Sequence, residues 1–122
     1  MRVIVVDDEP VIADTLVDIL AGEGYEAFTV ANGHAAIHWA RMILPDIIIT
    51  DVIMPGINGV ETAAIIKQFL PDCRIILFSG QAASIDLLEK ARADGYKFEV
   101  LAKPIKPSEL VLTLRLPQRA CA

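Results

Sequence analysis

The sequence predicts an α/β fold in which a parallel five-stranded sheet is covered by helices on both faces. Short apolar segments alternate along the whole chain with longer segments whose apolar residues recur every three or four positions. Strands buried on both faces have the first pattern, and amphipathic helices have the second. Five repeats of a strand followed by a helix predict a sheet whose strands run parallel.

The strands are predicted where branched and aromatic residues follow one another. The clearest runs are Val3-Ile4-Val5-Val6, Ile47-Ile48-Ile49 and Ile75-Ile76-Leu77-Phe78. No apolar run approaches the ~18 residues that a membrane-spanning helix needs, so we expect no membrane insertion. In chain order, the predicted strands lie near residues 2–6, 26–31, 47–50, 74–78 and 98–102.

The helices are predicted from proline and glycine at their ends and from the apolar spacing between them. Pro10 and Pro107 each suit the first turn of a helix, where a backbone N–H is not needed. Gly22 ends the first helix, and Pro45 ends the second, which follows a turn at Asn32-Gly33. In chain order, the helical apolar faces cover Ile12–Leu20, Ile37–Leu44, Ile65–Leu70, Ile85–Ala91 and a last short segment before Pro117.

The length and the short connections restrict the topology. The 122 residues suit one domain over 1–122, with a short tail at 117–122. Right-handed crossovers leave few arrangements, and the flavodoxin-like strand order 2-1-3-4-5, a three-layer sandwich of (βα)5 units, is the leading one. In that order the first and third strands are neighbours, and a site is expected just past their C-terminal ends.

Charge and cysteine content narrow the function classes. Eleven basic and sixteen acidic residues give a formal net charge of −5, which argues against direct binding to nucleic acid. Two cysteines are too few for a disulfide scaffold, and no charged leader precedes the first apolar strand. We therefore expect a cytoplasmic protein.

The polar residues that could perform chemistry all follow predicted strands. Asp7-Asp8-Glu9 follows the first strand, Asp51 the third, Ser79 the fourth and Lys103 the fifth. In a parallel sheet these positions share one edge. Two carboxylates about 4 Å apart repel each other by roughly 4 kcal/mol at an effective dielectric constant of 20, so a cation has to compensate them. Oxygen ligands beside a lysine suit Mg²⁺, with Mn²⁺ as the alternative ion.

Such a site suits phosphoryl transfer. A cation between carboxylates neutralises charge on the phosphoryl oxygens while one carboxylate attacks as the nucleophile. Lys103 can pair with a second phosphoryl oxygen, and the hydroxyl of Ser79 can reach a third. Each predicted strand end at this edge therefore has a chemical role.

Five motifs make the sequence resemble the receiver domain of two-component response regulators, from residue 2 to about residue 116. Their order and spacing are specific, because four separate strand ends have to match together. The motifs are VIVVDDEP (3–10), ANGHAAI (31–37), PDIIITDVIMPGINGVE (45–61), IILFSG (75–80) and LAKPIKPSEL (101–110).

The resemblance implies a phosphorylation site and a metal site that share residues. Asp51 matches the phosphoacceptor of the family. Asp8 matches the direct metal ligand, and Asp7 matches the acidic residue that holds the ion through water. The backbone carbonyl of Ile53 is a further implied ligand, and Mg²⁺ is the implied ion.

The resemblance also implies how the phosphoryl group is held and what the protein is. Ser79 matches the hydroxyl that moves towards the phosphoryl group, and Lys103 matches the phosphate-binding lysine. Pro104 fits a cis Lys–Pro bond. The implied protein is a phosphoacceptor switch and not an enzyme, beyond assisting its own phosphorylation and dephosphorylation.

The partners implied by the resemblance are proteins. A sensor histidine kinase or a phosphotransfer protein is the expected phosphoryl donor. Output is expected in trans, to a downstream protein, because the residues after Pro117 are too few to make an effector domain, and the chain is either a stand-alone regulator or part of a longer protein. The fourth helix, fifth strand and fifth helix, between Leu87 and Leu114, form the face on which family members usually meet partners or form a homodimer.

The sequence departs from the family three residues before the lysine. Many receivers carry an aromatic residue there whose ring rotates inward, and this chain has Val100, with Tyr96 and Phe98 as candidate substitutes. Ile53 and Gln81 occupy positions that in this family influence how easily water attacks the acyl phosphate. We expect the bulky side chain of Ile53 to slow that hydrolysis.

Some residues also have a purely structural interpretation. Asp7 and Asp8 suit a solvated turn that caps the first helix. His34 and His38 have a spacing that can bind zinc, but no further ligand is obviously placed, so surface histidines are favoured. Cys73 is expected to be a structural rather than a reactive thiol.

Three alternative functions compete with the phosphorylated switch. A phosphorylation-independent interaction module, or pseudo-receiver, is favoured by Val100, although Asp51 and Lys103 argue against it. A haloacid-dehalogenase-like phosphatase needs a second Asp two residues after the nucleophile, where this chain has Ile53. A flavodoxin needs a phosphate-binding loop rich in Gly, Ser or Thr after the first strand, where this chain has Asp-Asp-Glu-Pro.

Overall fold

Five parallel strands form one sheet in the computed structural model, which describes residues 1–80, 83–96 and 98–117. The strand order is β2-β1-β3-β4-β5, and every neighbouring pair is parallel, which confirms the predicted flavodoxin-like topology. Gln81 and the tail after Pro117 lie outside the described residues. Within the described part of the chain, no helix is both long enough and apolar enough to cross a membrane.

Strands and helices alternate as the sequence predicts. Small differences concern the strand ends: β2 stops one residue earlier than predicted, while β3 and β4 continue through the residues expected to follow them. In chain order the elements are β1 (Arg2–Val6), α1 (Pro10–Gly22), β2 (Glu26–Val30), α2 (Gly33–Ile43), β3 (Ile47–Asp51), α3 (Gly59–Phe69), β4 (Arg74–Ser79), α4 (Ala83–Ala93), β5 (Glu99–Ala102) and α5 (Pro107–Arg115).

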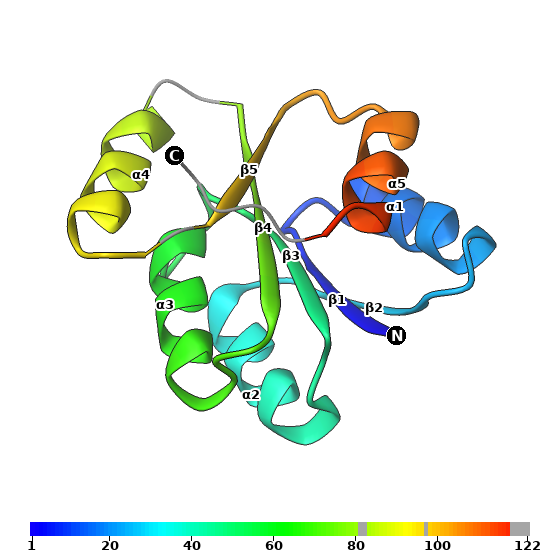
Figure 1. The fold of residues 1–122 in the computed structure, drawn as a ribbon, viewed down its shortest axis with the longest axis horizontal. Coiled ribbons are helices and arrows are strands. Elements are labelled where there is room, and N and C mark those ends of the chain that lie inside the picture. Colours follow the sequence, from blue (N-terminus) through cyan, green and yellow to red (C-terminus); the bar gives the residue numbers. More distant parts are fainter. Residues whose placement is uncertain (81–82, 97, 118–122) are drawn as a thin grey trace.

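The helices cover the sheet in two layers, with α1 and α5 on one face and α2, α3 and α4 on the other (Figure 1). Successive strand residues point to opposite faces, so each strand supplies both cores. In β1, Ile4 and Val6 pack under α2 and α3, whereas Val3 and Val5 pack under α1 and α5. These four side chains are at most 1% exposed, which explains why the strands are apolar at every position.

The helix starts have identifiable caps. Asn32, predicted to lie in a turn, is instead the N-cap of α2: its side-chain oxygen accepts a hydrogen bond from the backbone of Ala35 at 2.8 Å. Asn58 and Glu61 form a reciprocal capping box at the start of α3. That box fixes the direction in which the chain leaves the loop after β3.

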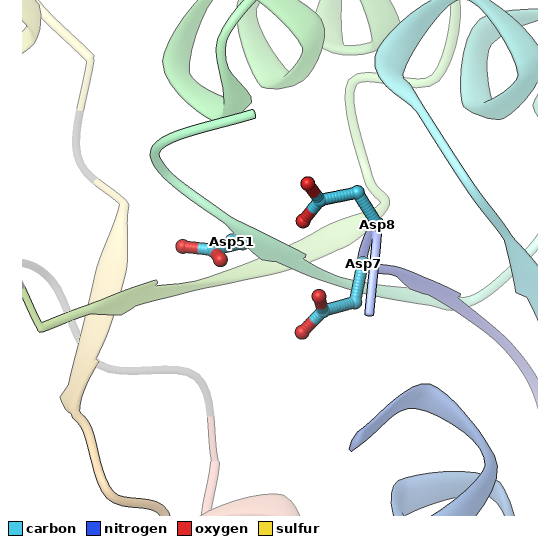
Figure 2. A group of neighbouring side chains, drawn as sticks. All are labelled: Asp7, Asp8 and Asp51. Atoms are coloured by element: carbon cyan, nitrogen blue, oxygen red, sulfur yellow. The ribbon is translucent and has the colours of Figure 1, made fainter. Parts of the chain in front are cut away.

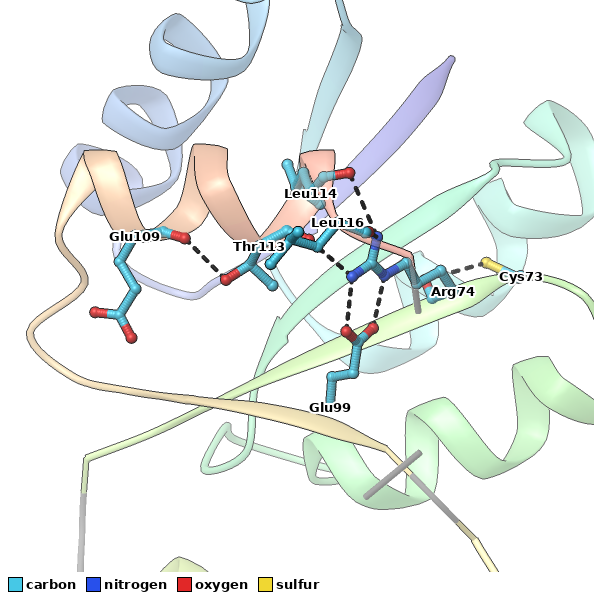
Figure 3. Close-up of polar contacts among 7 residues, drawn as sticks. All are labelled: Cys73, Arg74, Glu99, Glu109, Thr113, Leu114 and Leu116. Carbon is cyan, nitrogen blue, oxygen red and sulfur yellow. Dashed lines mark hydrogen bonds and ion pairs between the residues drawn. The ribbon is translucent and has the colours of Figure 1, made fainter. Parts of the chain in front are cut away.

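A buried ion pair that was not predicted from the sequence joins the starts of β4 and β5 to the C-terminal end of α5. Arg74, the first residue of β4, makes a bidentate contact with Glu99, the first residue of β5, at 2.6 and 2.7 Å (Figure 3). Its guanidinium also donates to the carbonyls of Thr113 and Leu116, each at 2.9 Å. The hydrogen bond from Arg74 to Glu99 raises the pKa of the guanidinium, so the arginine stays charged.

Candidate functional site

The register of the sheet brings the predicted site residues to one edge. Asp51 is the last residue of β3 and lies opposite Phe78, so Ser79, the last residue of β4, comes one step further along the same edge. Lys103 follows Ala102, which pairs with Ser79. Asp7 follows β1, whose last residue is paired with the residue before Asp51.

Three carboxylates converge where β1 and β3 end. One oxygen each from Asp7, Asp8 and Asp51 lies within 4.8 Å of the other two. Figure 2 shows the two side chains from the β1–α1 loop beside that of Asp51. Asp7 and Asp51 are 3% and 8% exposed, while Asp8 is exposed, so the cluster lies half inside the protein and opens to solvent on one side.

Asp7 carries an oxygen that has no protein partner. Its Oδ1 accepts a hydrogen bond from the backbone N–H of Glu9 at 2.9 Å, but Oδ2 is buried without a hydrogen bond among the described residues. Burial raises the pKa of the Asp7 carboxyl, with a further increase from the charges of Asp51 and Asp8, against the lowering effect of the Glu9 N–H and Lys103. An orphaned oxygen beside two more carboxylates fits a hard divalent cation such as Mg²⁺.

Lys103 provides the positive charge on the other side of Asp51. Its ammonium lies 2.7 Å from Asp51 Oδ2. Burial alone would lower the pKa of Lys103, but the hydrogen bond and charge of Asp51, with the charges of Asp7 and Glu9, raise it above its ordinary value. Gly80 allows the approach, because a Cβ there would lie 2.7 Å from Lys103 Cβ. The Lys103–Pro104 peptide bond is cis, in agreement with the sequence.

The hydroxyl of Ser79 contacts a residue that sequence reasoning missed. Its Oγ forms a hydrogen bond with Oγ of Ser84, in the first turn of α4. Ser84 is 0% exposed, and it lines a cavity of about 250 Å³ together with Asp51, Ile53 and Lys103. Nothing in the sequence distinguished Ser84 from an ordinary serine near a helix start.

Ile53 lies two residues beyond Asp51 and lines this cavity. Its backbone N–H donates to Asp51 Oδ1 over 3.4 Å, and its side chain is half-buried. A close approach of backbones holds this segment in place: the N–H of Gly59 donates to the carbonyl of Val52 at 2.8 Å, and a Cβ on Gly59 would collide with the carbonyl of Asp51. The loop after β3 therefore needs glycine at the first position of α3.

The aromatic residues near β5 are stacked on each other in this structure. Val100 is 39% exposed. Phe98 is buried in the core beneath α4, and the ring of Tyr96 stacks on it with centroids 5.4 Å apart and planes 10° from parallel. Both rings therefore pack against α4 and against each other, two to four residues before Val100.

The remaining residues considered in the sequence lie away from this edge. His34 and His38 are exposed on α2, where the ring of His38 meets Trp39 edge-on at 5.2 Å. Cys73 is 4% exposed, and burial raises the pKa of its thiol to about 11. An inert, structural thiol agrees with both observations.

Comparison with known proteins gives matches over nearly the whole chain. The family described as the response regulator receiver domain matches residues 3–115. The DNA-binding response regulator MtrA of Mycolicibacterium smegmatis is 30% identical over 116 residues, which cover 93% of this chain and 49% of the relative. The DNA-binding transcriptional regulator NtrC of Azospirillum brasilense is 38% identical over 109 residues, or 89% of this chain and 22% of the relative. The chain thus spans half or less of the length of these relatives.

Solved structures of similar length match as well. The chemotaxis protein CheY4 of Vibrio cholerae superimposes with a TM-score of 0.83 at 29% identity, covering 93% of this chain and 95% of the other. The beryllofluoride-activated NtrC4 receiver domain dimer gives a TM-score of 0.81 at 35% identity, with 93% of each chain covered.

Proposed function

The chain belongs to the response regulator receiver domain family, and from this we propose that it is a phosphoacceptor switch of a two-component system. The observation that carries the proposal is the convergence of Asp7, Asp8 and Asp51 within 4.8 Å, next to an ammonium 2.7 Å from Asp51. In this proposal Asp51 receives the phosphoryl group. A histidine kinase or phosphotransfer protein is the donor.

Three protein groups divide the work of the transfer. An oxygen of Asp51 forms the new O–P bond while the bond between phosphorus and the donor breaks, and the donor leaves with the electron pair. The ammonium of Lys103 then pairs with a phosphoryl oxygen, since it already lies against Asp51. The hydroxyl of Ser79, from the adjacent strand end, donates to another phosphoryl oxygen.

Mg²⁺ is the proposed cofactor, with Mn²⁺ as the alternative. Asp8 and Asp51 are its proposed direct ligands with the Ile53 carbonyl, and Asp7 holds it through water. The orphaned Oδ2 of Asp7 supports this assignment, because a buried carboxylate oxygen requires a partner. When bound, the ion neutralises charge on the phosphoryl oxygens.

Output is proposed to pass to a separate protein through α4, β5 and α5, the same face serving a homodimer if one forms. Several apolar side chains are exposed there, which supports contact with another chain. They are Ile85, Val100, Leu112 and Leu116. We propose that one domain covers residues 1–122. We also propose that the protein is cytoplasmic, because the free thiol of Cys73 and the net charge of −5 are compatible with a reducing compartment.

The proposal is tested by mass spectrometry of the intact protein after incubation with Mg²⁺ and acetyl phosphate. The parent protein is expected to gain one phosphoryl group, and Asp51→Asn none. Asp18→Asn, which removes an exposed carboxylate on α1, should behave like the parent. A parent protein that gains no mass would favour the pseudo-receiver instead.

A further inference from the structure

We infer that Ser84 is a positioning residue: its buried hydroxyl holds that of Ser79 and so links the phosphorylation site directly to α4. This inference rests on the proposed function of Asp51. It concerns a residue to which neither the family motifs nor the sequence reasoning gave a role. The two hydroxyls form a hydrogen bond between the end of β4 and the first turn of α4.

The burial of Ser84 increases the free energy needed to break its contact with Ser79. Its side chain is 0% exposed, so its hydrogen bond to Ser79 is made away from bulk water. A buried hydrogen bond costs more to break than one that bulk water can replace. A Ser79 hydroxyl that turns to a phosphoryl group on Asp51 therefore does so at the expense of its contact with Ser84.

The cavity at the site shows the same arrangement. Ser84, Asp51 and Lys103 line it. The hydrogen bond to Ser84 directs the Ser79 side chain towards α4 in this structure. Phosphorylation then draws Ser79 out of its contact with α4, and anything that displaces the first turn of α4 frees Ser79 for the phosphoryl group. By linkage the two effects have the same size.

The residue at position 100 makes this link more important. Val100 has no ring that could follow the movement of Ser79, and the rings of Tyr96 and Phe98 are stacked on each other. The Ser79–Ser84 pair connects the end of β4 to α4 with a single hydrogen bond. It needs no aromatic intermediary.

The test is a double-mutant cycle on the affinity for beryllofluoride in the presence of Mg²⁺, because beryllofluoride mimics a phosphoryl group on a carboxylate. The four proteins are the parent, Ser84→Ala, Ser79→Ala and the double variant. Ser84→Ala frees Ser79 and is expected to tighten binding about 2- to 10-fold, the range of one neutral hydrogen bond. In the Ser79→Ala background the same substitution should have no effect.

Two further variants serve as controls for the double-mutant cycle. Ser108→Ala removes an exposed hydroxyl from the first turn of α5 and should bind like the parent. Ser84→Cys keeps nearly the same volume with a much weaker donor, so it should also tighten binding and replaces Ser84→Ala should that variant not fold.

The outcomes separate this inference from the proposed function. Unchanged affinity in the Ser84 variants, or an equal change with and without the Ser79 hydroxyl, would overturn the role of Ser84 alone. A parent protein that binds no beryllofluoride with Mg²⁺ would overturn the proposed function and the inference together. Tightening that depends on Ser79 supports both.

Discussion

The ammonium of Lys103 lies 2.7 Å from Oδ2 of Asp51, although 52 positions separate the two residues in the chain. The contact reaches across β4, and Gly80 leaves room for the stem of the lysine. Asp51 therefore has a protein cation on one side and two carboxylates, from Asp7 and Asp8, on the other. In the proposed site, the metal ion and the lysine share this one acidic residue.

Lys103→Met should strengthen Mg²⁺ binding. The substitution removes a positive charge that opposes a second cation at Asp51, and we expect about 3- to 10-fold tighter binding, a modest part of the Coulomb energy at such distances. Isothermal titration calorimetry measures it. Lys106→Met removes an exposed lysine three residues later and should leave the affinity within about twofold. Weaker Mg²⁺ binding by Lys103→Met would contradict the shared-site interpretation.

Ile53→Asn should shorten the lifetime of phosphorylated Asp51. The half-buried isoleucine lines the cavity beside Asp51, and we expect an amide in its place to admit water and to orient it by hydrogen bonding. We expect the half-life of the acyl phosphate to fall several-fold to about tenfold, the effect of one positioned hydrogen bond. Ile53→Leu keeps the apolar bulk and should retain the parent half-life, measured by loss of the phosphorylated mass after removal of the donor. An equal half-life for Asn and Leu would refute the screening role.

Arg74→Met should strongly destabilise the fold. The side chains of Arg74 and Glu99 are 11% and 6% exposed, and removal of the guanidinium takes away the bidentate partner of a buried carboxylate, at a cost of about 3–5 kcal/mol. Urea unfolding measures the free energy. Arg115→Met is the matched control, because the Arg115–Glu23 pair is mostly exposed and contributes about 0–1 kcal/mol.

Replacement of both Arg74 and Glu99 tests whether the buried ion pair is the cause of the lost stability. The double variant Arg74→Met, Glu99→Leu removes both charges of the ion pair and should recover most of the lost stability. A double variant as unstable as Arg74→Met would instead assign the loss to the hydrogen bonds with the carbonyls at the end of α5.

Cys73 should make stability fall in alkaline solution. Burial raises the pKa of its thiol from 9.0 to about 11 in the folded protein. Above the unfolded value the unfolded chain loses the proton first, so this stability is fully present below pH 9 and is lost as the pH rises towards 11. The full loss amounts to about 2–3 kcal/mol.

The Cys73→Ala variant isolates this effect, because every other titrating group is common to both proteins. The difference in unfolding free energy between parent and variant should shrink from pH 8 towards pH 11. A difference that stays constant over this range would show that the thiol is not protected by burial.

The fold and the strand-end residues followed from the sequence because they depend on local pattern and topology. Apolar runs such as Ile47–Ile49 are buried on both faces, so the runs alone identify parallel strands. Once the order 2-1-3-4-5 is accepted, Asp51, Ser79 and Lys103 have to share an edge. The family motifs then added a chemical role to each position.

The parts that escaped prediction depend on side-chain packing between distant segments. Arg74 and Glu99 begin two strands 25 positions apart, and neither is unusual in its own segment. The contact of Ser79 with Ser84 depends on where the first turn of α4 lies, which no periodicity fixes. Asn32 was placed in a turn because Asn-Gly favours turns as strongly as Asn favours a helix N-cap.

The most direct test of the central claim is to locate the phosphoryl group in the sequence. After incubation with acetyl phosphate, borohydride reduction of the acyl phosphate marks the modified carboxylate for peptide mass spectrometry. We expect the mark on Asp51, present with Mg²⁺ and absent when a chelator removes the ion. A mark on another carboxylate, or an equal mark on Asp51 without any divalent cation, would contradict the account.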